Sequence, residues 1–165
     1  MNRAQRDAYC GSPATLYQRI AAILAPAILA GLLIYQAIIY HTLPKRIPTS
    51  FNFAGEVTGW SGRGTVWILP VVGVVTDITM LLVGLSPQTW NTGTRITVFN
   101  RARVFRLVRD LLADLRLSMA LMWTGITLYI LYTAGRHGWL LAAGTLVLIF
   151  APIARYFLRL YVFRR

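Results

Sequence analysis

"IAAILAPAILAGLLIYQAIIY", residues 20–40, is the stretch that decides the fold class. It holds no charged residue, and about 20 apolar residues are enough to cross about 30 Å of hydrocarbon as a helix. Pro26 is expected to kink this helix at a tolerable cost, because neighbouring helices satisfy the freed carbonyl. A signal peptide is the competing interpretation, but its apolar region would be shorter and would end in a small-residue cleavage site. The run therefore predicts an uncleaved transmembrane helix.

Three further apolar runs follow, over residues 65–85, 117–133 and 139–158. The chain of 165 residues is 56% hydrophobic and 13% charged, against about 25% charged residues in a soluble domain. We therefore expect residues 1–165 to form one integral membrane domain, an all-α membrane protein with four transmembrane helices.

The connecting segments differ in character. Residues 86–116 begin with a turn-rich half and end in a basic amphipathic helix that leads into the third span, because Val104, Val108, Leu111 and Leu115 share one helical face. The sequence "AGRHG", residues 134–138, predicts a tight turn between the last two helices.

The distribution of basic residues predicts the orientation in the membrane. The chain has 17 Lys and Arg residues against 5 Asp and Glu, and a formal charge of +12. If both termini share one side, only Lys45, Arg46, Arg63 and Arg136 lie on the other. Since cytoplasmic loops carry the basic excess, residues 1–19, 86–116 and the basic tail 159–165 are expected in the cytoplasm. Anionic lipid headgroups are the expected partners of that basic face, and nucleic acid is not.

This orientation makes residues 41–64 a folded extracytoplasmic loop. Pro44 and Pro48 push the preceding residues toward an extended conformation. Phe51, Phe53 and Trp60 are expected to fold back onto the outer ends of the helices, because so many rings are not left in water. A structural cap on the bundle and a binding surface are both open interpretations. The candidate binding residues are Pro44, Lys45, Arg46, Pro48, Phe51, Asn52, Gly55 and Trp60.

The string "LPKRIPTSFNFAGEVTGWSGR", residues 43–63, resembles the signature of a bacterial membrane domain of unknown function, LP-x-x-IPTHFN-x-x-G-x-x-D-x-W. That domain also occurs in immunity proteins against the sporulation-delaying toxin. The resemblance implies a multi-pass protein of the bacterial cytoplasmic (inner) membrane and an immunity-like role. Ser50 stands where the signature has His, and Thr58 where it has Asp. Any protonatable or metal-binding pair that those two family residues form is therefore absent from this chain.

Asp77 is the only acidic residue inside a predicted span. It lies about 12 Å from the inner end of the second span at 1.5 Å per residue, where an ionised carboxylate is costly. One hypothesis is an ion or proton site. The other is a structural role, with Asp77 either protonated or paired with Arg116 or Arg155; we favour the protonated structural form, because one carboxylate alone makes a poor relay.

Other chemistry finds little support in the sequence. The single cysteine, Cys10, is expected to be a reduced thiol. His41, His137 and Glu56 lack the spacing of a metal site, and no nucleophile or phosphate-binding motif appears. We expect no enzyme activity, no metal and no cofactor.

Three functions are compatible with this pattern. The leading one is a non-enzymatic, immunity-like or regulatory binding module, whose outer loop contacts a peptide, a toxin or a membrane protein. The second is a small ion- or proton-coupled transporter that uses Asp77. The third is an accessory subunit that stabilises a larger membrane complex.

Overall fold

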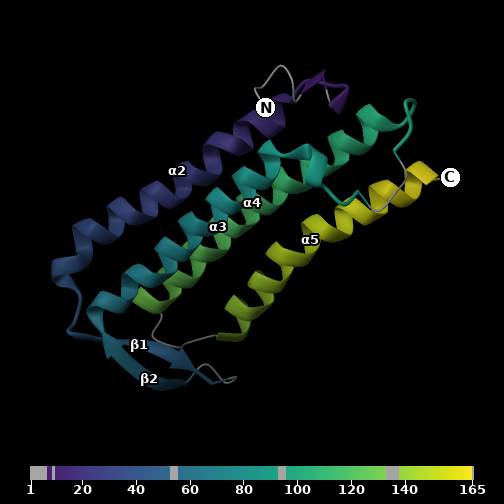
Figure 1. The fold of residues 1–165 in the computed structure, drawn as a ribbon. Coiled ribbons are helices and arrows are strands. Elements are labelled where there is room, and N and C mark those ends of the chain that lie inside the picture. Colours follow the sequence, from purple (N-terminus) through teal and green to yellow (C-terminus); the bar gives the residue numbers. More distant parts are fainter. Residues whose placement is uncertain (1–6, 9, 53–55, 93–95, 133–137, 165) are drawn as a thin grey trace.

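The computed structural model describes residues 7–8, 10–52, 56–92, 96–132 and 138–164. Within these residues, four helices are long and apolar enough to cross a membrane. Figure 1 shows them running side by side, with a β-hairpin at one end of the bundle and both chain termini at the other. The helices are α2 (Leu16–Ile39), α3 (Ile68–Leu85), α4 (Arg101–Tyr132) and α5 (Gly138–Arg164).

Helix α2 begins four residues before the expected span and contains its apolar run except for Tyr40. The Thr15 side chain accepts a hydrogen bond from the Gln18 amide, and the Gln18 side chain accepts one from the Thr15 amide. This capping box satisfies two backbone donors at the start of the helix. Pro26 lies inside the helix, and the short 3₁₀ turn η1 (Tyr40–Thr42) follows its end.

Helix α4 is the central element of the bundle, because it contacts α2, α3, α5 and strand β1. It joins the expected amphipathic segment and the third apolar run into one uninterrupted helix of 32 residues. Of the residues expected on its apolar face, Val104 and Val108 are buried. The central core cluster is formed by Ala25, Leu29 and Ala120.

Gly73 allows α3 to approach this core closely. A Cβ atom at that position would lie 3.0 Å from the Leu29 Cδ2 atom and 3.2 Å from the Trp123 Cβ atom, which is closer than ordinary packing. The outward faces of the helices are apolar instead of polar: Ile23, Ile38, Val147 and Leu158 each expose more than 60% of their surface. An apolar exterior of this kind is typical of helices that face lipid.

The loop between α2 and α3 contains an antiparallel hairpin, and this corrects the all-α expectation. Strand β1 (Arg46–Phe51) pairs with β2 (Val57–Gly62), with Pro48 opposite Trp60 and irregularities in register between Pro48 and Phe51. The amide of Arg63 donates to the Lys45 carbonyl at 3.0 Å and closes the base of the hairpin. The 3₁₀ turn η2 (Arg63–Trp67) then leads into α3. A further 3₁₀ turn, η3 (Pro87–Thr89), follows the end of α3. The expected turn at residues 134–138 begins in residues outside the described part of the chain.

Candidate functional site

Buried side chains on β1 attach the hairpin to the bundle. Ile47 is 3% exposed, and Pro48 is buried next to it. The Phe51 ring packs edge-on against the Tyr129 ring of α4, with the ring centres 5.8 Å apart. This contact agrees with the expectation that the outer loop folds back onto the helix ends. The hairpin therefore has a fixed place on the bundle.

Asn52 organises the turn of the hairpin. Its side-chain amide donates to the Glu56 carboxylate at 2.8 Å, and its side-chain oxygen accepts from the Glu56 amide at 2.9 Å. Its backbone amide donates to the Glu56 carbonyl. These three bonds make Asn52 a structural residue of the turn. The predicted binding residue Gly55, and Phe53, lie outside the described part of the chain.

The surface of the hairpin is formed by Pro44, Lys45, Arg46 and Trp60, all of them exposed, and we call these four residues the hairpin surface. The expectation that Trp60 is buried is wrong, because its side chain is 59% exposed. Pro48, which lies opposite Trp60 in the strand pair, is buried instead. Neither Lys45 nor Arg46 forms an ion pair with any carboxylate among the residues that the structure describes. The hairpin surface therefore exposes two positive charges and one aromatic ring.

Asp77 lies in the interior of the bundle and is bound by Arg116 of α4. The Arg116 Nε atom lies 2.7 Å from Oδ1 of Asp77, and its Nη2 atom lies 2.9 Å from Oδ2. Both side chains are 8% exposed. Since both carboxylate oxygens accept a guanidinium hydrogen bond, this geometry is that of an ionised carboxylate. The structure thus favours the paired alternative, with Arg116 as the partner, over the protonated form that the sequence led us to prefer.

Arg155 has a different partner from the one considered in the sequence. It binds Asp114 of α4 at 2.9 Å, and the Tyr17 hydroxyl of α2 donates to the same carboxylate. One helical turn away, Asp110 accepts from Gln18 at 2.7 Å and from Arg159 at 3.0 Å. Two carboxylates on one face of α4 therefore tie it to both α2 and α5.

The sequence analysis did not predict these contacts of Asp110 and Asp114 with α2 and α5. The spacing of Asp110 and Asp114, four residues apart, was a signal that they share a face. The identity of their partners depends on how three separate helices pack, and no local pattern encodes it. The same holds for the pair of Asp77 and Arg116.

The N-terminal segment packs against the same end of α4. Arg109 forms an ion pair with Asp7 at 3.0 Å and donates to the Ser12 carbonyl at 2.9 Å. Cys10 is fully buried beside them. Burial raises the pKa of its thiol, and the adjacent Arg109 opposes this only in part. The thiol is therefore protonated at neutral pH and is a weak nucleophile.

Within the described residues, no group of three or more His, Cys, Asp or Glu side chains is arranged to hold a metal ion. His41 is exposed and packs edge-on against Tyr40. His137 belongs to the residues that are not described.

Comparison with known proteins bears on the hairpin more than on the ion pairs. No curated protein and no solved structure matched the chain. Residues 27–74 match the model of a domain of unknown function, DUF1648. The matched segment covers the second half of α2, the whole hairpin and the start of α3. Asp77 and Arg116 lie outside it.

Proposed function

We propose that this protein is a non-enzymatic binding module of the bacterial cytoplasmic membrane, with an immunity-like or regulatory role. Its hairpin surface faces out of the cytoplasm and contacts an acidic segment of a peptide toxin or of a membrane protein partner. The observation that carries the proposal is the contrast within the hairpin. Ile47 and Pro48 are buried and anchor the hairpin to the bundle, whereas Lys45, Arg46 and Trp60 are exposed.

A preformed surface of this kind suits protein recognition. The proline-bounded strand and the turn at Asn52 fix the backbone, so that little conformational entropy is lost on binding. Tryptophan and arginine are the residue types most often found where interfaces gain their energy. Lys45, Arg46 and Arg63 outweigh Glu56 on this loop, and such a charge balance favours an acidic partner.

The orientation in the membrane rests on the basic residues. Both termini, the start of α4 and the end of α5 lie at one end of the bundle (Figure 1), and this end contains most of the arginines. The positive-inside rule assigns this end to the cytoplasm and the hairpin to the outer face. The basic end then meets the anionic lipid headgroups of the inner leaflet.

The transporter alternative has weaker support. A transport carboxylate must exchange its proton or ion, but both oxygens of Asp77 are engaged by Arg116. A buried bidentate pair is costly to open, because either charge alone would be stranded in a low-dielectric interior. The pair is better suited to holding α3 against α4.

Site-specific photocrosslinking in native membranes tests the binding proposal. A photoreactive phenylalanine analogue in place of Trp60 is expected to give a discrete polypeptide adduct. The same analogue at Ile38, which is 72% exposed on α2, is the control for non-specific crosslinking to lipid and neighbouring proteins. The yield at position 60 should fall as salt is added, because exposed charges are screened.

Two variants separate recognition from folding. Lys45→Ala with Arg46→Ala is expected to lower the adduct yield about fivefold or more without changing the melting temperature, since both side chains are exposed. Lys45→Arg with Arg46→Lys keeps the charge and should retain the adduct. An adduct that is insensitive to salt and to the alanine pair would overturn the proposal. If every loop variant that lowers the adduct yield also lowers the melting temperature, the hairpin is a structural cap. The accessory-subunit alternative is then favoured.

A further inference from the structure

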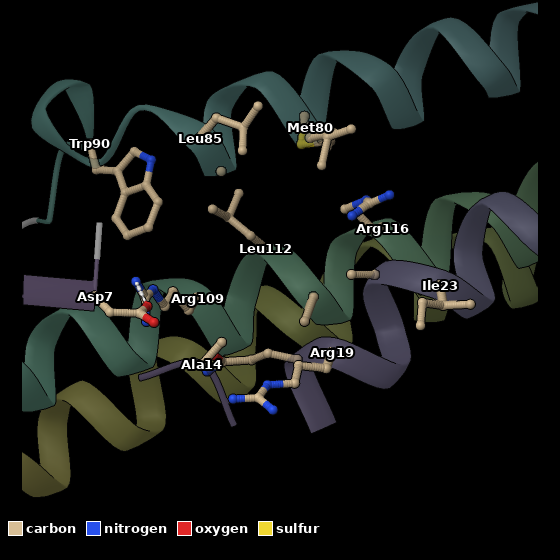
Figure 2. A pocket seen from close by; sticks show the side chains of 15 residues that line it. Asp7, Ala14, Arg19, Ile23, Met80, Leu85, Trp90, Arg109, Leu112 and Arg116 are labelled. Carbon is tan, nitrogen blue, oxygen red and sulfur yellow. Dashed lines mark hydrogen bonds and ion pairs between the residues drawn. The ribbon is translucent and has the colours of Figure 1, made fainter. Parts of the chain in front are cut away.

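A pocket of about 420 Å³ lies between α2, α3 and α4 at the end of the bundle where the termini lie. Figure 2 shows Met80 and Leu85 of α3 along one side, Ile23 of α2 along the other, and Leu112 of α4 between them. Its size falls within the range of about 300–1,000 Å³ that is typical of small-molecule sites. This pocket is separate from the hairpin, which lies at the opposite end.

The wall of the pocket is mostly apolar and continues into the lipid-facing surface of the protein. Ile23 is 72% exposed, and Leu81 of α3, which also lines the pocket, is 40% exposed. Such side chains are found where a helix meets hydrocarbon. A lipid chain can therefore reach the pocket laterally, without crossing water.

The polar edge of the pocket is basic. Its described lining contains three arginines and one aspartate. Arg109 is paired with Asp7, and Arg116 with Asp77. Arg19 is exposed, and it has no ion-pair partner among the residues that the structure describes. Of the three guanidinium groups at the polar edge of this mostly apolar pocket, that of Arg19 is the one without an ion pair among the described residues (Figure 2).

From this combination we infer that the pocket binds one anionic phospholipid of the inner leaflet. An acyl chain lies between α2 and α3 against Ile23, Met80 and Leu112, and the lipid phosphate accepts hydrogen bonds from Arg19. A free anion would leave the apolar wall without a partner. Basic pockets between transmembrane helices on the cytoplasmic side are suited to anionic headgroups, because charge and chain are satisfied together.

Native mass spectrometry of the full-length protein in a non-ionic detergent tests this assignment. Phosphatidylglycerol and phosphatidylcholine with identical chains are the two probes, and inorganic phosphate is the third. We expect phosphatidylglycerol, with its net negative charge, to bind about fivefold more tightly than phosphatidylcholine, because the choline cation of the latter offsets the attraction of its phosphate to Arg19. Phosphate in excess should not displace the lipid. Complete displacement by phosphate would instead indicate a free-anion site, and would contradict the proposal.

Arg19→Gln removes the proposed phosphate contact and should abolish most of the preference for phosphatidylglycerol. Arg106→Gln is the matched control, because Arg106 is an exposed arginine of α4 that does not line this pocket. An unchanged preference in Arg19→Gln, or an equal loss in Arg106→Gln, would show that the headgroup lies elsewhere.

Gly84→Phe tests the chain site separately from the charge. A Cβ atom at Gly84 would meet only the Leu112 Cδ1 atom, at 4.0 Å, so that a ring placed there fills the pocket. Both lipids are expected to lose their tight binding. Gly31→Phe is the control, because a Cβ atom at Gly31 meets nothing within 4 Å and this residue is exposed outside the pocket. Melting curves establish that each variant is folded, and retained binding in a folded Gly84→Phe protein contradicts the site.

Discussion

The buried ion pair between Asp77 and Arg116 determines what a change at either residue costs. Each side chain is 8% exposed, and the two are joined by two short hydrogen bonds. Their attraction offsets the cost of removing both charges from water, and this balance holds only while both partners are present. Single and double substitutions are therefore expected to behave very differently.

We predict that Asp77→Asn lowers the free energy of unfolding by about 3–5 kcal/mol, because it leaves the Arg116 guanidinium buried without a counter-charge. Thermal melting of the detergent-solubilised protein measures this loss. Adding Arg116→Met should restore a large part of it, since the double variant buries no charge. Glu56→Gln, at an exposed carboxylate, should change the melting temperature little, because the Gln amide oxygen still accepts the hydrogen bond from the Asn52 side chain. An Asp77→Asn protein that melts like the parent would mean that the carboxylate is not ionised.

At the scale of the element, the hairpin combines buried anchoring residues with exposed ones. Pro48 is buried, Phe51 packs on Tyr129, and Trp60 is exposed. Stability is therefore expected to depend on the residues of β1 far more than on the largest ring of β2.

We predict that Pro48→Ala and Phe51→Ala each destabilise the protein by about 1 kcal/mol, through a freer unfolded chain and the loss of an aromatic pair. Trp60→Ala should stay within about 0.5 kcal/mol of the parent. Thermal melting in detergent compares the three variants. A large loss in Trp60→Ala, with none in Pro48→Ala, would contradict this assignment of buried and exposed residues.

The sequence could predict the helices because their cause is local. A charge-free run such as residues 20–40 is enough to specify a span, and the spacing from Val104 to Leu115 is enough to specify an amphipathic helix. The prolines predicted extended backbone around Pro44 and Pro48, but not a hairpin. Strand pairing with an irregular register depends on contacts between residues about ten positions apart, and the exposure of Trp60 depends on that register.

The choice of partner in each ion pair could not be predicted for a related reason. Arg116 and Arg155 were equally good candidates for Asp77 by depth alone, and only the rotation of α4 and α5 separates them. By contrast, the basic character of the segments at the end that holds both termini was evident from the sequence. The pocket beside Arg19 required three helices to be placed together.

At the scale of the whole molecule, the proposed orientation places the hairpin of the four-helix bundle outside the cytoplasm and its basic end inside. The binding role of the hairpin surface and the lipid site near Arg19 both require this orientation. The two ends of the bundle can be distinguished by thiol labelling, because the single native cysteine is buried and its raised pKa slows background reaction.

The most direct test is labelling of intact cells with a membrane-impermeant thiol reagent, in a Cys10→Ala background. One variant carries Thr58→Cys on β2 and the other Gln88→Cys in η3, and both positions are exposed. Permeabilised cells show that both cysteines react when they are accessible. The proposed orientation predicts that only the Thr58→Cys protein is labelled in intact cells. Labelling of the Gln88→Cys protein alone would contradict this orientation.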